Sequence, residues 1–72
     1  MTILKEYRIN HKLKQYEMAE KLDCSLQSYR LYENGDIGMP VKIIINFLKL
    51  KGTQHDMYLV KELEDIYGKE KL

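Results

Sequence analysis

Hydrophobic residues recur every three to four positions along most of the chain, the spacing expected of helices with one buried face. The first such stretch carries Ile3, Leu4 and Tyr7, and Thr2 stands ahead of it as a helix cap. Residues 10–12 interrupt the periodicity and include weak helix formers, so a turn is expected there.

Two short amphipathic stretches follow. The second predicted helix runs from about residue 15 to residue 22 and buries Met18, Ala19 and Leu22 on one face. After a break at residues 23–25, Ser25 caps a third helix that runs to about residue 33. Gly35 then ends this helix, because glycine tolerates the left-handed conformation of a C-terminal cap.

The second half of the sequence predicts two more helices. Pro40 suits the first turn of a fourth helix, which runs on to a stop at Gly52. Its three consecutive isoleucines would also suit a strand, but the apolar stretch is too long for one. Thr53 and Asp56 form a variant of the capping box that opens a fifth helix, and Gly68 is expected to end it.

These elements predict an all-α fold: a compact five-helix domain that spans residues 1–72, with a helix-turn-helix at about residues 15–33. A chain of 72 residues lies near the lower limit for unaided folding, and 44% hydrophobic residues favour a folded chain. The predicted core draws on all five helices: Leu4, Tyr7, Met18, Ala19, Leu22, Tyr32, Ile44, Phe47, Leu48, Val60 and Leu63. Met57 and Tyr67 are expected on the inner face of the fifth helix.

The composition argues against several classes of function. One cysteine, Cys24, allows no internal disulfide, and no apolar run is long enough to span a membrane, so the bacterial cytoplasm is the expected compartment. His11 and His55 lie far apart, and there is no glycine-rich phosphate loop. We therefore expect no enzyme activity, no metal and no cofactor.

The net charge of +1 bears on nucleic-acid binding. Residues 1–35 hold six Lys or Arg against five Asp or Glu, and residues 36–72 hold six against six. A DNA-binding module usually carries a basic excess or a clustered basic face. Any DNA binding by this chain would depend on a small local patch.

Seven residues stand in an order and spacing typical of one family: Arg8, Gln15, Ala19, Ser28, Glu33, Asn34 and Gly35. From about residue 4 to residue 50, the chain resembles the helix-turn-helix domain of the phage repressor and Cro-like family. The resemblance implies that Arg8 on the first helix forms a structural ion pair with Glu33. It also implies a small residue at Ala19, where the second and third helices cross closely.

The resemblance further implies a DNA-binding surface. Lys14 and Gln15 match the phosphate contacts at the start of the second helix. The base-reading positions on the third helix are Leu26, Gln27, Ser28, Arg30 and Leu31. Gln27 is suited to adenine and Arg30 to guanine or phosphate, whereas Ser28 is expected to pack inward.

Several residues depart from the pattern of a DNA-binding protein. Leu26 and Leu31 offer no hydrogen bonds, and "DIGMP" after the third helix puts Asp36 where family members carry lysine or arginine. If they face outward, these leucines form an apolar patch with Ile37, Met39 and the edges of Tyr29 or Tyr32. Such patches, with an arginine at the rim, are typical of protein–protein contacts.

Two functions therefore stay open. The chain resembles antirepressors of temperate lactococcal-type phages, which implies that the helix-turn-helix binds the N-terminal DNA-binding domain of a phage repressor and blocks its access to the operator. The alternative is a Cro-like regulator that binds double-stranded operator DNA directly. The antirepressor is the preferred hypothesis.

Overall fold

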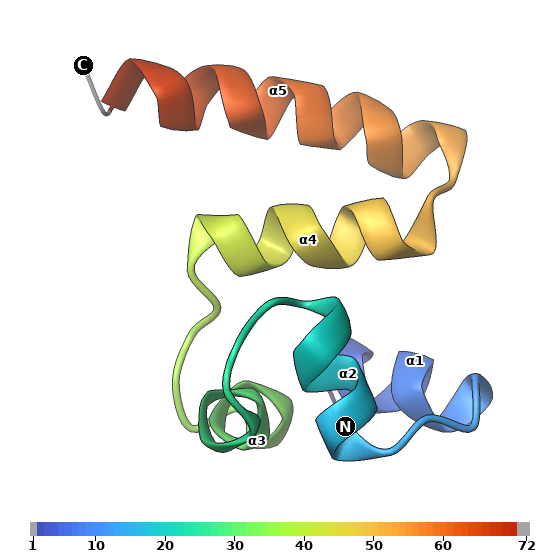
Figure 1. Ribbon diagram of the computed structural model, residues 1–72. Coiled ribbons are helices and arrows are strands. Elements are labelled where there is room, and N and C mark those ends of the chain that lie inside the picture. The colour runs from blue at the N-terminus through green and yellow to red at the C-terminus, as the bar shows by residue number, and fades with distance from the viewer. Residues whose placement is uncertain (1, 71–72) are drawn as a thin grey trace. The chain divides into compact units, whose positions relative to one another are not determined.

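The computed structural model describes the backbone of residues 2–70 and the side chains of residues 2–66. Within that part of the chain, every regular element is an α-helix, which confirms the all-α prediction (Figure 1). The helices are α1 (Ile3–Asn10), α2 (Gln15–Lys21), α3 (Leu26–Asn34), α4 (Val41–Lys51) and α5 (Gln54–Glu70). None of them, over the residues described, has the length and apolar character needed to span a bilayer.

The helices pack into two compact units, Met1–Met39 and Pro40–Leu72. In the first unit, α3 packs against both α1 and α2. In the second unit, α4 and α5 lie side by side and run in opposite directions (Figure 1). The helix-turn-helix, α2 to α3, belongs entirely to the first unit.

The boundaries of α1 and α3 follow from their caps. The Thr2 hydroxyl accepts a hydrogen bond from the Lys5 N–H at 3.3 Å, and the Ser25 hydroxyl accepts one from the Ser28 N–H at 3.0 Å. At the far end of α3, Gly35 has a φ of +78°, the left-handed conformation predicted for it. These three end signals in the sequence are confirmed.

The turn between α2 and α3 is held by its backbone. Asp23 has a φ of +58°, a conformation that aspartate tolerates better than most residues. The chain then reverses, and the Cys24 N–H donates to the Ala19 carbonyl at 3.0 Å. Cys24 is thereby half-buried, and burial raises the pKa of its thiol.

The core of the first unit is formed by five residues that are at most 3% exposed: Leu4, Met18, Ala19, Leu22 and Tyr29. Four of them were predicted. The sequence left open whether Tyr29 or Tyr32 shows an edge at the surface, and the side chain of Tyr29 is completely buried. Tyr7 and Tyr32, predicted for the core, are half-buried.

The second unit buries Ile43, Ile45, Phe47 and Val60. Phe47 and Val60 were predicted, but the prediction chose Ile44 where the structure buries Ile43 and Ile45. These two isoleucines lie about 200° apart around the helix axis, so α4 is buried on two sides rather than along one stripe. A single-face pattern could not find both.

Four further predictions about the second unit were wrong. Leu48 and Leu63 are half-buried, like Ile44, and Met57 is 46% exposed. Pro40 is the N-cap of α4 rather than part of its first turn.

Helix α5 also continues past Gly68 to Glu70, because a glycine inside a helix costs only about 1 kcal/mol and does not by itself end it. The side chain of Tyr67 lies outside the described residues.

The start of α5 has the predicted cap. The Thr53 hydroxyl accepts from the Asp56 N–H at 3.0 Å and donates to the Asp56 carboxylate at 2.6 Å. That hydrogen bond lowers the pKa of Asp56, and the Lys51 ammonium 3.7 Å away acts in the same direction. The capping-box variant in the sequence is confirmed.

The close packing at Ala19 gives a test of the helix-turn-helix core. We expect Ala19→Leu to destabilise the protein by about 1–3 kcal/mol, because the added atoms have no free space in a buried position. Urea unfolding followed by circular dichroism would measure the change. The matched control is Glu20→Leu, at the next, exposed position of α2. If both variants were equally stable, Ala19 would not be a packing constraint.

Candidate functional site

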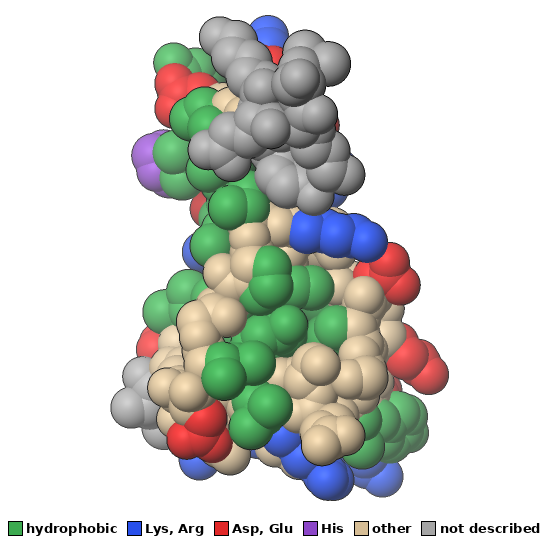
Figure 2. Space-filling view, turned by 90° about the vertical axis from the view of Figure 1, so that its left-hand side faces the viewer, with side chains coloured by type: hydrophobic (Ala, Val, Ile, Leu, Met, Phe, Trp, Pro, Cys, Tyr) green, Lys and Arg blue, Asp and Glu red, His purple; other side chains and the backbone are tan. Residues whose placement is uncertain are grey.

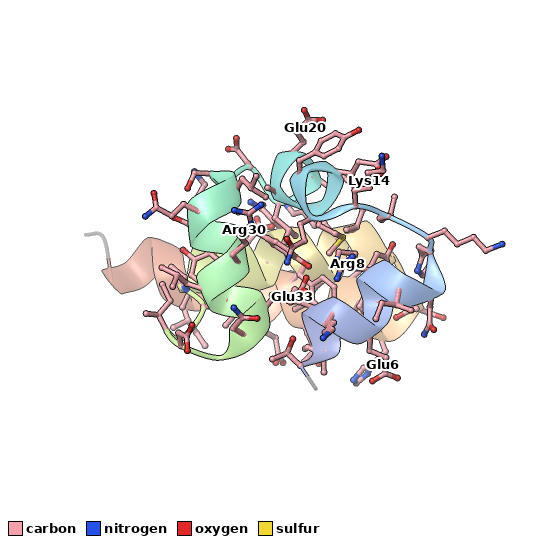
Figure 3. All side chains as sticks on the ribbon, turned by 90° about the horizontal axis from the view of Figure 1, so that it is seen from below. Glu6, Arg8, Lys14, Glu20, Arg30 and Glu33 are labelled. Carbon is pink, nitrogen blue, oxygen red and sulfur yellow. The ribbon has the colours of Figure 1, made fainter. Side chains whose placement is uncertain are left out.

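Arg8 and Glu33 join α1 to the end of α3 through a two-pronged ion pair. The Arg8 Nε donates to Glu33 Oε2 at 2.8 Å, and Nη2 donates to Oε1 at 3.0 Å. The third nitrogen, Nη1, donates to the Leu13 carbonyl at 3.1 Å. In Figure 3 the two labelled side chains point toward one another between their helices.

The Glu33 carboxylate is an almost fully buried charge, with a side chain only 2% exposed. Burial alone would raise the pKa of Glu33, but the interactions with Arg8, Tyr29 and Gln15 together outweigh it and the pKa is lowered. The hydrogen bond between Arg8 and Glu33 also raises the pKa of Arg8. Both groups are therefore charged in the folded protein near neutral pH.

Tyr29 lies one helical turn before Glu33 and takes part in the core rather than in the surface. Burial, followed by the side-chain interaction with the Glu33 carboxylate, raises the pKa of its hydroxyl. The hydroxyl is buried and meets no hydrogen-bond partner of adequate geometry among the described residues. Tyr29 therefore contributes nothing to an exposed patch.

Gln15 connects the buried ion pair to the surface. Its Nε2 donates to Glu33 Oε1 at 3.3 Å, and its Oε1 accepts from the Arg30 Nε at 3.2 Å. Gln15 is half-buried, whereas Arg30 is exposed on α3. A continuous set of polar contacts thus runs from α1 through α3 and α2 to an exposed guanidinium.

Lys14 is the N-cap of α2 and is exposed. Its backbone N–H donates to the Glu17 carboxylate at 2.9 Å. A negative charge therefore already occupies the start of α2, where the resemblance implies a phosphate contact. The phosphate-binding role of Lys14 and Gln15 stays a prediction, and Glu17 opposes it electrostatically.

The outward side of α3 differs from the expected one. Gln27 and Arg30 are exposed, but Leu26 and Leu31 are half-buried. Both leucines were expected to face outward, and each keeps only part of its surface accessible. On a nine-residue helix that buries Tyr29 and Glu33, the positions beside these two are partly covered as well.

The segment after α3 is exposed as the sequence indicated. Ile37 is 45% exposed and Asp36 is exposed, while Met39 is half-buried. Ser28 is half-buried, and its hydroxyl accepts a hydrogen bond from the Ser25 hydroxyl at 2.9 Å. We name as the α3 surface Leu26, Gln27, Arg30, Leu31, Ile37 and Met39.

Two residues near the start of α2 were missed by sequence reasoning. Tyr16 on α2 is 52% exposed and stands next to Gln15 in the chain. In the sequence, Tyr16 lies outside the apolar face of this helix, and that position could have indicated that its side chain is exposed. Glu17 was missed as the group that occupies the start of α2.

The charges around the site are mixed. On the face that Figure 2 shows, both basic and acidic side chains are present, and the basic ones form no continuous area. The described residues also include no group of three or more histidine, cysteine or acidic side chains arranged to hold a metal ion. The available chemistry is hydrogen bonding by amide and guanidinium groups combined with apolar contact.

Comparison with known families adds one finding. The family model described as "Helix-turn-helix" matches residues 4–51, two thirds of the chain. Searches of curated proteins and of solved structures find no match.

The ion pair predicts a specific dependence of stability on pH. Because the pKa of Glu33 is lower in the folded than in the unfolded protein, its stabilising effect is complete above the unfolded pKa of about 4.3. It is lost as the pH falls from there through the folded pKa.

We therefore expect Glu33→Gln to be less stable than the wild type at pH 7. When the pH is lowered from 7 to 3.5, the free energy of unfolding should fall less in the variant than in the wild type. Urea titrations of both proteins at the two pH values would measure this. Equal acid losses in the two proteins would mean that Glu33 is not the group responsible.

Proposed function

The chain belongs to the helix-turn-helix family of DNA-binding transcriptional regulators, and we propose that it acts as an antirepressor in the lysis–lysogeny switch of a phage. In this role the α3 surface binds the N-terminal DNA-binding domain of the phage repressor. The repressor is then blocked from its operator. The observation that carries the proposal is the chemistry of the side chains on and around α3. Acidic groups stand where phosphates would approach, and apolar groups are accessible.

Acidic groups stand where DNA phosphates would approach. Asp36 is exposed directly after α3, and the Glu17 carboxylate occupies the start of α2. Residues 1–35 carry a net charge of only +1. Since phosphate neutralisation supplies most of the affinity of small DNA-binding modules, this arrangement favours another partner.

The α3 surface has the composition of a protein contact. Ile37 is 45% exposed, and Leu26, Leu31 and Met39 each keep part of their apolar surface accessible. Gln27 and Arg30 supply polar groups beside them. Apolar anchors with an arginine nearby are typical of the residues that dominate protein–protein affinity.

Direct operator binding is the second candidate, because Gln27 and Arg30 are exposed on the helix that enters the major groove in this family. Glutamine can pair with adenine and arginine with guanine through two hydrogen bonds each. Under this alternative, specificity depends on these two residues, and the leucines contribute only contacts to thymine methyl groups.

We expect intrinsic DNA affinity to be weak and its salt dependence shallow. Each phosphate contact contributes about one unit to the slope of log affinity against log salt concentration, and few such contacts are available. Gel shifts with candidate operator DNA at 50 and 200 mM salt, with and without the neighbouring repressor, would measure both quantities. Specific binding at about 10⁻⁸ M or tighter would favour the Cro-like alternative.

Two leucine variants separate the hypotheses at single residues. We expect Leu26→Ala and Leu31→Ala each to weaken repressor binding about thirtyfold, equivalent to about 2 kcal/mol, because each removes an apolar anchor. Calorimetric titration against the repressor domain would measure the affinity.

Since both leucines are half-buried, thermal melts must first establish that each variant is folded at the titration temperature. Ile9→Ala is the matched control: Ile9 is 50% exposed but lies on α1, outside the α3 surface. Unchanged affinity in both leucine variants would exclude the antirepressor mechanism.

A further inference from the structure

The contacts of Gln15 leave its side-chain amide only one orientation. The Glu33 carboxylate is ionised and only accepts hydrogen bonds, so it must face the Gln15 nitrogen. The Arg30 guanidinium only donates, so it must face the Gln15 oxygen. Both contacts are made by one planar group, and reversing that group would break both.

We infer that Gln15 and Glu33 are positioning residues for Arg30, and that the guanidinium they orient recognises a carboxylate of the partner protein. Glu33 is itself fixed by Arg8, through hydrogen bonds of 2.8 and 3.0 Å. The orientation of an exposed arginine on α3 is thus set by a buried ion pair that reaches back to α1. This inference rests on the proposed protein-binding function.

The chemistry of the free end of Arg30 indicates the ligand. Its Nε is held by Gln15, and its two terminal nitrogens form no ion pair with the described residues. These nitrogens lie in one plane, and their spacing matches the two oxygens of a carboxylate. Holding the guanidinium still before binding reduces the entropy lost when that contact forms.

The positioning can be tested in the free protein. The chain contains only two arginines, Arg8 and Arg30, so a nitrogen–hydrogen correlation spectrum of arginine side chains has two Nε–H signals to assign. We expect the Arg30 Nε–H of the wild type to exchange with water about tenfold more slowly than in Gln15→Ala, because the variant removes its acceptor.

The Arg8 signal should be the same in both proteins. Gln27→Ala is the matched control, since it removes a glutamine from the same helix as Arg30 without removing the acceptor. If the Arg30 Nε–H exchanged equally fast in the wild type and in Gln15→Ala, Gln15 would not position it.

Binding to the repressor DNA-binding domain tests the second half of the inference. Arg30→Lys keeps the charge but loses the planar pair of donors. We expect this variant and Gln15→Ala each to bind about tenfold more weakly, and the double variant to bind no more than about tenfold more weakly, because both changes disable the same contact. A loss of about a hundredfold in the double variant would overturn positioning, since it would mean that the two residues act independently.

The outcomes separate this inference from the proposed function. If the wild type did not bind the repressor domain, the proposed function and the carboxylate partner would both fail, while proton exchange at Arg30 would still decide the positioning. If Arg30→Lys instead abolished specific binding to a guanine-containing operator, the partner assignment would be wrong.

Discussion

The burial of one negative charge organises the helix-turn-helix unit. A carboxylate that is removed from water must be compensated by hydrogen bonds and by an opposite charge. Glu33 obtains both from Arg8, and a further hydrogen bond from Gln15. Its backbone carbonyl also accepts a hydrogen bond from the Thr2 hydroxyl at 2.8 Å, which links the cap of α1 to the end of α3. The three helices of this unit are therefore connected through a single residue.

The sequence predicted the helices better than the buried positions. Caps and glycine stops are local signals, and Thr2, Ser25, Gly35 and Thr53 each act where they were expected. Gly68 was misjudged because a glycine inside a helix has only a modest cost and does not by itself end the helix. Burial depends on neighbours that are distant in sequence, which is why a single-face pattern selected Ile44 instead of Ile43 and Ile45.

The same limitation affected the candidate site. Spacing alone cannot distinguish a tyrosine that contributes an edge to the surface from one that fills the core, and Tyr29 fills the core. Family spacing placed Gln15 and Arg30 correctly on α2 and α3. Their mutual hydrogen bond could not be predicted, because it depends on how closely the start of α2 approaches the outer side of α3.

The environment of Cys24 has a consequence for the chemistry of the chain in an oxidising medium. Thiolate, rather than thiol, is the form that attacks disulfides and oxidants, and burial raises the pKa of this thiol in the turn between α2 and α3. Folding therefore lowers the fraction of this cysteine that is thiolate and slows its reaction with oxidants. The thiol ionises more readily in an unfolded chain, so disulfide-linked dimers are expected to form faster whenever the turn between α2 and α3 opens.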